Sequence, residues 1–199
     1  LKWNRRFSIY DETDSQTLVK EIVTQDMSLD PKKYDPKKIK WAISNSKNQC
    51  LTPDQVKEKA DNHFDETIAD VYRKYRIALS KNNSLDFDDL LLLPVFLLRQ
   101  NESVRDYWHK RFKHILIDEY QDTNRTQYEL IKLITTGKVD SSDFSKWDNR
   151  SIFVVGDADQ SIYSFRAADF RILIGFQDDF KNESPQGNES IVKLEENYR

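Results

Sequence analysis

The stretch from residue 115 to residue 124 constrains the fold of this chain more than any other. It begins with three apolar residues, Ile-Leu-Ile, and runs directly into two adjacent carboxylates, Asp118 and Glu119. A continuous apolar run is typical of a parallel strand covered on both faces, and ligands bind beyond the carboxyl ends of such strands. Two acids placed there could hold a magnesium ion and polarise a water molecule. The alternative is a strand followed by solvated acids that cap a helix.

Two later segments repeat this pattern of an apolar strand that ends in polar residues. Residues 152–155 lead into Asp157 and Gln160, and residues 191–194 lead into a polar end at Arg199. A helix predicted from about residue 124 to residue 135 separates the first two strands, and the order strand, helix, strand, helix, strand indicates a parallel α/β sheet. Because the carboxyl ends of parallel strands meet at one edge, the polar residues at these ends are expected to converge on one crevice.

The first 113 residues predict an all-helical unit. Residues capable of capping a helix stand at Asp14 or Ser15, at Thr52, and at Ser84 or Asp86. The helix that begins at Thr52, with Pro at its first position, is expected to continue to residue 81 with an aromatic stripe facing the core. The whole chain has four glycines and five prolines, which also favours helices over a loop-rich all-β fold.

A basic segment interrupts this helical unit between residues 30 and 47. The favoured interpretation is a solvated connector around a short helix near residues 39–43, and the alternative is a patch that contacts phosphates without reading sequence. The six lysines concerned are Lys32, Lys33, Lys37, Lys38, Lys40 and Lys47.

Charge and cysteine content limit the class of protein. Residues 1–113 carry 21 Lys and Arg against 18 Asp and Glu, whereas residues 114–199 carry 10 against 16, so a mildly basic part precedes an acidic one. The single cysteine, Cys50, excludes an internal disulfide and a structural zinc site, which indicates a reducing, intracellular setting. The sequence has neither an apolar run of membrane-spanning length nor the apolar segment of a signal peptide. Both ends are expected to be internal positions of a longer protein.

Three segments resemble motifs II, III and IV of the UvrD/PcrA/Rep helicases, superfamily 1 motors that move 3′ to 5′ on single-stranded DNA. They are residues 118–124 (DEYQDTN), 155–166 (VGDADQSIYSFR) and 194–199 (LEENYR). Residues 86–91 resemble a further motif upstream of motif II, and residues 7–48 resemble the start of the family's helical insertion. The resemblance covers nearly the whole chain.

The resemblance implies an α/β fold: part of a RecA-like P-loop NTPase sheet, together with an all-helical insertion subdomain. Residues 1–113 would form the helical insertion (1B-like), and residues 114–199 would form a partial motor domain (1A-like) with motifs II, III and IV. No Gly-x-x-x-x-Gly-Lys-Ser/Thr loop occurs in the sequence. In the family this loop lies N-terminal to the matching segment, so these 199 residues alone are expected not to hydrolyse ATP.

The resemblance also implies a role for each residue of the nucleotide site. Asp118 would bind Mg²⁺, and Glu119 would be the general base for the water that attacks the γ-phosphate of ATP. Gln160 would contact that phosphate and couple it to the DNA site. Arg199 would also reach the γ-phosphate, and Tyr198 would stack on the adenine.

For the DNA site, the resemblance implies that Tyr163 and Phe165 stack on bases of the single strand, with Arg166 nearby. Flat aromatic side chains accept any base, which suits a motor that steps without reading sequence. The chain departs from the family at Ala167, where Gly is usual, and at Phe165, where many relatives have Trp. Residues 137–150 make a longer connection than usual.

The function expected from this resemblance is an ATP-dependent 3′-5′ DNA helicase or translocase acting in DNA repair, replication or recombination. Its cofactors would be ATP and Mg²⁺, and its partners single-stranded DNA and the duplex junction, without a membrane. It would reside in the bacterial cytoplasm or nucleoid, or in the nucleus or an organelle of a eukaryote. The alternatives are a non-catalytic DNA- or protein-binding remnant of the family and a helicase-nuclease subunit.

Overall fold

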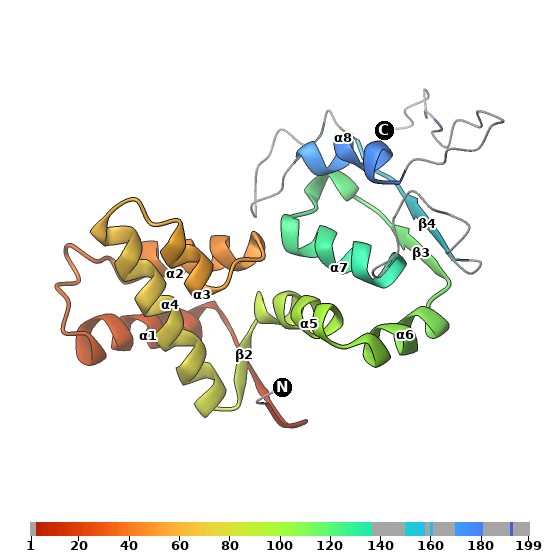
Figure 1. Cartoon of the computed structure of the whole chain (residues 1–199). Helices are drawn as coiled ribbons and strands as arrows, with labels where there is room; N and C mark the ends of the chain where they lie inside the picture. Colours follow the sequence, from red (N-terminus) through yellow and green to blue (C-terminus); the bar gives the residue numbers. More distant parts are fainter. Residues whose placement is uncertain (1–2, 137–149, 158–159, 161–169, 181–191, 193–199) are drawn as a thin grey trace.

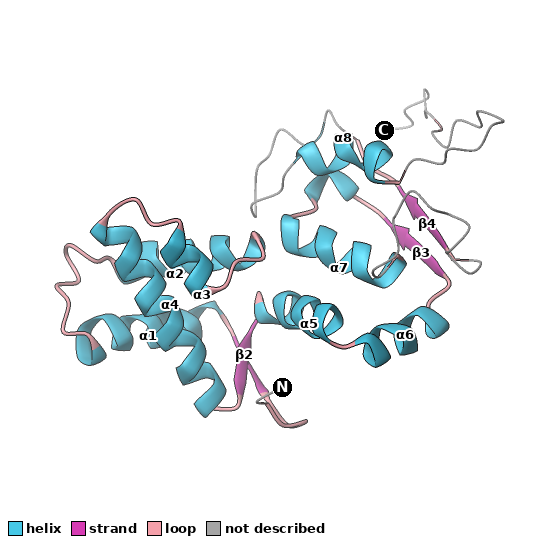
Figure 2. Cartoon of the chain, in the orientation of Figure 1, coloured by secondary structure: helices cyan, strands magenta, loops and turns pink. Residues whose placement is uncertain are grey.

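The computed structural model describes residues 3–136, 150–157, 160, 170–180 and 192. These residues form a largely helical structure with two small parallel sheets, arranged as two groups of helices beside each other (Figures 1 and 2). The helices are α1 (Glu12–Glu21), α2 (Pro36–Asn48), α3 (Pro53–Glu58), α4 (His63–Lys81), α5 (Asp89–Gln100), α6 (Glu102–Arg111), α7 (Arg125–Thr135) and α8 (Phe170–Asp179). The strands are β1 (Ser8–Tyr10), β2 (Ser84–Asp86), β3 (His114–Ile117) and β4 (Ser151–Val154).

Helices α1 to α4 make the first group, which packs around α4. Tyr72, Tyr75 and Leu79 of α4 are completely buried, as are Ile39 and Ile43 of α2. These apolar residues recur at three- and four-residue steps, so one face of each helix is apolar and turns inward. The prediction that the aromatic stripe of α4 belongs to the core is confirmed.

Helices α5 to α8 and the sheet of β3 and β4 make the second group. Leu92, Val95 and Leu98 of α5 form one apolar cluster with Leu133 of α7. On the other side of α7, the inner face of the sheet and helix α8 form another cluster, which includes Tyr120. Helix α7 is therefore buried between α5 and the sheet, and this packing positions the residues that follow β3.

Strands β3 and β4 pair in parallel, with His114 opposite Ser151 and Ile117 opposite Val154. The sequence predicted both strands and their parallel direction, and both predictions are confirmed. The third predicted strand, residues 191–194, lies outside the described residues except for residue 192.

Several helix boundaries differ from the sequence prediction. Helix α1 is capped by Asp11 in a reciprocal capping box with Asp14, instead of by Asp14 or Ser15. Thr52 caps α3 as predicted, but that helix ends at Glu58 and α4 starts anew after its own cap, Asn62. The Asn62 side chain accepts hydrogen bonds from the backbone N–H groups of Phe64 and Asp65. This local bonding favours a new helix start at Asn62 over continuation of α3.

Ser84 or Asp86 was predicted to cap a helix that starts at residue 86. The Asp86 carboxylate does accept a hydrogen bond from the N–H of Asp89, the first residue of α5, at 2.9 Å, but residues 84–86 themselves form strand β2. Ser84 pairs with Ser8 and Asp86 with Tyr10 in a parallel sheet of two short strands. All three residues of β2 are buried, and α5 starts after Asp88, which makes no side-chain capping bond. The pairing with β1, more than 70 residues away, is a tertiary effect that local sequence does not signal.

The basic segment 30–47 is not a uniformly solvated connector. Lys40 and Lys47 are buried, with 4% and 0% of their surface exposed. Lys47 lies 2.8 Å from carboxylate oxygens of both Asp86 and Asp89, and the Tyr75 hydroxyl donates to Asp86 as well. Lys32, Lys33, Lys37 and Lys38 are exposed. Two of the six lysines are therefore structural, and the expected short helix is the 13-residue α2.

Candidate functional site

The ends of β3 and β4 lie side by side, and the chain segments that follow them stay hydrogen-bonded. The backbone N–H of Val155 donates to the carbonyl of Ile117 at 2.8 Å, and the N–H of Tyr120 donates to the carbonyl of Val155 at 2.9 Å. The acids after β3 and the polar residues after β4 are thus held in one place, as expected for parallel strands.

Glu119 has a left-handed backbone conformation, with φ 51° and ψ 42°. A non-glycine residue in this region costs about 1–3 kcal/mol and persists only where its surroundings enforce it. Here the Asp118 carboxylate accepts a hydrogen bond from the N–H of Glu119 at 2.9 Å, and a short 3₁₀ turn at Tyr120–Asp122 follows directly. The strained turn places two exposed carboxylates next to each other at the end of β3.

Gln121, which was not among the predicted site residues, joins the two strand ends. Its Nε2 donates to Oε2 of Glu119 at 2.7 Å, and its Oε1 accepts from the N–H of Asp157 at 3.0 Å. Only 3% of its surface is exposed. Gln160 donates to the Asp157 carboxylate at 2.7 Å. The burial of Gln121 and its bond to Asp157, 36 residues along the chain, arise only when the two strands pair, so no local sequence signal identifies it.

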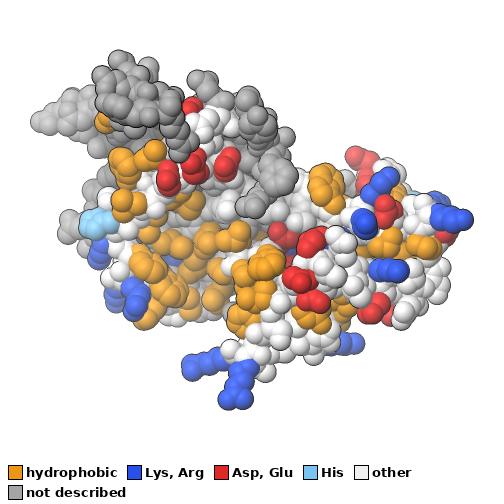
Figure 3. Space-filling view, turned by 180° about the vertical axis from the view of Figure 1, so that it is seen from behind, with side chains coloured by type: hydrophobic (Ala, Val, Ile, Leu, Met, Phe, Trp, Pro, Cys, Tyr) orange, Lys and Arg blue, Asp and Glu red, His pale blue; other side chains and the backbone are white. Residues whose placement is uncertain are grey.

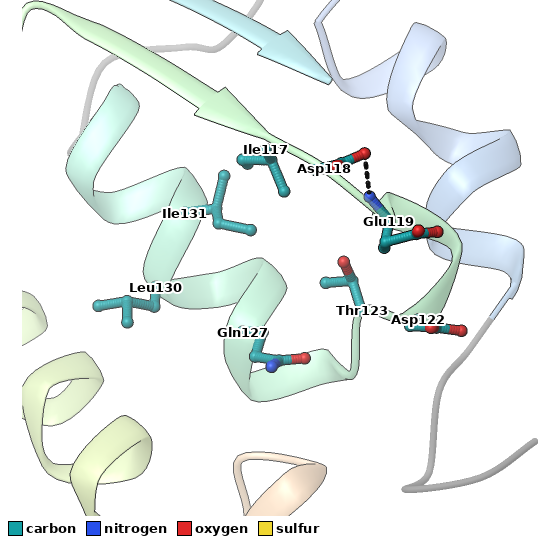
Figure 4. Close-up of a pocket in the computed structure, with 8 residues that line it drawn as sticks. All are labelled: Ile117, Asp118, Glu119, Asp122, Thr123, Gln127, Leu130 and Ile131. Carbon is teal, nitrogen blue, oxygen red and sulfur yellow. Dashed lines mark hydrogen bonds between the residues drawn. The ribbon is translucent and has the colours of Figure 1, made fainter. Parts of the chain in front are cut away.

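A cavity of about 290 Å³ opens beside these acids (Figure 4). Ile117, Leu130 and Ile131 form its apolar side, and the carboxylates lie on the opposite, polar side. The lining is completed by Asp118, Glu119, Asp122, Thr123 and Gln127. A cavity with an apolar wall and a few convergent polar groups is the usual form of a small-molecule site.

The carboxylates at the end of β3 fit a magnesium ion that takes most of its ligands from water and substrate phosphates. Within the described ranges, no three His, Cys, Asp or Glu side chains gather as a metal cluster. Magnesium commonly takes one or two carboxylates and completes its octahedron with water and substrate phosphates. Asp118 offers such a carboxylate, because it is exposed and only its Oδ1 is used by the N–H of Glu119.

Five predicted site residues lie outside the described residues. Asp118, Glu119 and Gln160 are brought to the same pair of strand ends, with Gln160 linked to Glu119 through Asp157 and Gln121. The roles predicted for the remaining residues stay predictions; these residues are Tyr163, Phe165, Arg166, Tyr198 and Arg199.

Gly156 is required by the close approach of Gln121. A Cβ added to Gly156 would lie 2.8 Å from Oε1 and 3.2 Å from the backbone nitrogen of Gln121. We expect Gly156→Ala to lower the free energy of unfolding by about 1–3 kcal/mol, the usual cost of overpacking. Chemical denaturation of the variant measures this loss.

Gly175 provides the matched control for this prediction. It lies inside α8, and an added Cβ would meet nothing within 4 Å. Gly175→Ala should therefore stabilise the protein by about 0.5–1 kcal/mol, because alanine restricts the unfolded chain. Equal effects of the two substitutions would contradict the packing described at Gly156.

None of the described helices has both the length and the apolar composition needed to cross a bilayer. Comparison with protein families matches residues 1–181 to the UvrD/REP helicase N-terminal domain. The ATP-dependent DNA helicase PcrA of Bacillus subtilis is 39% identical over 98% of this chain, and the ATP-dependent DNA helicase Rep of Buchnera aphidicola is 40% identical over 100% of this chain.

PcrA of Staphylococcus aureus is similar to the same degree, with 38% identity over 98% of the chain. The chain spans about a quarter of the length of these relatives, 24% of the two PcrA proteins and 27% of Rep. The family model covers most of the chain, and the family expected from the motifs is confirmed. The chain belongs to the UvrD/REP helicase family and corresponds to part of its N-terminal domain.

Proposed function

We propose that this chain supplies part of the ATP-hydrolysing site of a DNA helicase that moves 3′ to 5′ on single-stranded DNA. The observation that carries the proposal is the joining of the two strand ends. Asp118 and Glu119 after β3 are linked by hydrogen bonds through Gln121 to Asp157 and Gln160 after β4. Relatives 38–40% identical to this chain are named ATP-dependent DNA helicases.

In the proposed mechanism each residue acts on one part of the nucleotide. Asp118 would hold Mg²⁺, which neutralises charge on the phosphates when bound. Glu119 would take the proton from the attacking water, and Gln160 would contact the γ-phosphate. Arg199 would stabilise the charge that develops on this phosphate, and Tyr198 would stack on the adenine.

The proposed architecture is a partial RecA-like motor domain in residues 114–199 with a helical insertion in residues 1–113. An uncovered apolar sheet face supports it: the side chains of Leu116 and Phe153 are 75% and 59% exposed. Parallel sheets are covered on both faces, so this sheet suits a larger layered fold. Hydrophobic side chains gather on the half of the molecule that contains this sheet (Figure 3). Helices α5 and α6 precede residue 114 but share an apolar core with α7, so they would pack with the motor part and only the helices before them would form the separate insertion.

The proposed DNA contacts are Tyr163 and Phe165, which would stack on successive bases, and Arg166, which would bind the backbone. Stacking contributes about 1–3 kcal/mol per base and tolerates any sequence. A motor acting on DNA during repair, replication or recombination would work in the bacterial cytoplasm or nucleoid, or in the nucleus or an organelle.

Metal removal and strand polarity test this proposal on the full natural chain. We expect ATP hydrolysis that single-stranded DNA stimulates, that EDTA abolishes and that added Mg²⁺ restores. This ATP hydrolysis should drive unwinding of a duplex with a 3′ single-stranded tail but not of a duplex with a 5′ tail. DNA binding without hydrolysis would instead support a non-catalytic remnant, and cleavage of the DNA would support a helicase-nuclease subunit.

A further inference from the structure

We propose that Gln121 is a positioning residue that holds the Glu119 carboxylate in place for proton abstraction and ties it to the end of β4. The inference rests on the proposed function, because it assigns Gln121 a task only if Glu119 is the general base. It names a residue that the motif resemblance left without a role.

The orientation of the Gln121 amide follows from its two partners. The backbone N–H of Asp157 can only donate, so the atom that faces it at 3.0 Å must be the oxygen, Oε1. The NH₂ group must then face Glu119, whose Oε2 lies 2.7 Å away. A carboxylate at this short distance from an N–H donor makes a charge-assisted hydrogen bond. Gln121 therefore holds Oε2 of Glu119 and leaves Oε1 to accept a proton from water.

The position of Gln121 is itself enforced by its surroundings. Its side chain is 3% exposed and lies against Gly156, where any larger residue would meet Oε1 at 2.8 Å. Glu119, in contrast, is exposed and has a flexible side chain. A general base must lie within hydrogen-bond reach of the proton that it abstracts, and loss of such a fixed geometry reduces the rate of the chemical step.

Two variants separate positioning of Glu119 from a purely structural link between strands. Gln121→Met keeps the approximate length and removes both hydrogen bonds. Gln121→Glu keeps an acceptor for the N–H of Asp157 but turns a carboxylate toward Glu119, so the link to β4 survives and the contact with Glu119 is repulsive. Gln16→Met is the control, because Gln16 makes the same kind of bond, 2.9 Å from Glu12, on the surface of α1.

The measurements are kcat and KM for ATP with saturating single-stranded DNA, and the melting temperature, all on the full natural chain. We expect kcat to fall about 10- to 100-fold in both Gln121 variants, the effect of one hydrogen bond to a charged group. KM should stay within about twofold, since the hydrogen bond from Gln121 to Glu119 would lower the energy of the transition state without contributing to ATP binding. Gln121→Glu should melt below the unmodified protein, because it buries a second carboxylate beside Glu119, and Gln16→Met should keep kcat, KM and the melting temperature.

A double substitution tests whether Gln121 acts through Glu119. In a Glu119→Gln background, adding Gln121→Met should cause no further loss of single-turnover hydrolysis, because the group that Gln121 positions can no longer take the proton. A further 10-fold loss, or unchanged kcat in both single variants, would overturn the inference. Absence of hydrolysis in the unmodified chain would instead refute the proposed function, so the two failures are distinguishable.

Discussion

Lys47→Ala should lower the free energy of unfolding by about 3–5 kcal/mol, the usual result of removing one partner from a buried ion pair. The ammonium group of Lys47 is fully buried and lies 2.8 Å from oxygens of Asp86 and Asp89, which are 2% and 3% exposed. Without Lys47, two carboxylates would remain buried without a counter-charge. Chemical denaturation of the variant and of the unmodified protein measures the difference.

The position of Lys47 explains why its loss should affect the whole structure. It lies in the last turn of helix α2 in the first group of helices, and its partners belong to β2 and α5. The hydroxyl of Thr126, at the start of α7, donates to the Lys47 carbonyl, and the Asn124 side chain donates to Asn48 at 2.8 Å. The cluster thus connects the helical part to the element that follows the candidate site.

The pH dependence of this contribution follows from the pKa shifts. Burial alone would lower the pKa of Lys47, but the carboxylates of Asp89 and Asp86 outweigh it and raise that pKa above its ordinary value of 10.5. Burial opposes ionisation of Asp86, yet the charge of Lys47 holds the pKa of Asp86 below 3.8. These two contributions should therefore be fully present between about pH 4 and pH 10. The Asp86 contribution is lost as the pH falls further, and the Lys47 contribution as the pH rises through the folded-state pKa.

Asp88 provides the matched control for this cluster. Burial raises the pKa of its carboxyl group, and its main hydrogen bond comes from the neutral hydroxyl of Ser44 at 2.7 Å. Asp88→Asn should therefore stay within about 1 kcal/mol of the unmodified protein, whereas Asp86→Asn should be strongly destabilising. A loss below about 1 kcal/mol for Lys47→Ala would contradict the assigned role of the cluster.

The elements that the sequence predicted well carry strong local signals. Thr52, with Pro53 and Gln55 behind it, makes a capping box, and the apolar runs 115–117 and 152–155 form the paired strands β3 and β4. Acids directly after an apolar strand also located the candidate site at Asp118 and Glu119. In each case the residues that specify the structure lie within a few positions of one another.

The features that the sequence did not reveal depend on distant partners. Lys47 was assigned to a basic, solvated segment, but its partners Asp86 and Asp89 are about 40 residues further along the chain. The short strand β2 exists because β1 lies beside it. Gln121 stood inside a recognised motif, yet its link to Asp157 appears only when the two strands are paired. Tertiary contacts of this kind override local propensity.

Glu119→Gln should abolish the hydrolytic step while binding survives. An amide cannot take the proton from the attacking water, and a general base contributes about 10²- to 10⁴-fold to the rate. The substitution keeps the side-chain volume, and the new amide oxygen can still accept the hydrogen bond from Gln121 that Glu119 now accepts at 2.7 Å. Asp118 is unchanged, so the affinity for nucleotide and for DNA should stay the same within a few fold. Glu66→Gln, on the exposed surface of α4, is the control and should keep full activity.

Single-turnover hydrolysis of ATP by the full natural chain, saturated with single-stranded DNA and Mg²⁺, tests the central claim most directly. The rate is compared between the unmodified protein and Glu119→Gln, with nucleotide binding measured on the same samples. If the ends of β3 and β4 form the hydrolytic site, the rate in the variant falls by about 10²- to 10⁴-fold at unchanged nucleotide affinity. Hydrolysis at the unmodified rate by a variant that binds nucleotide normally would show that Glu119 is not the base.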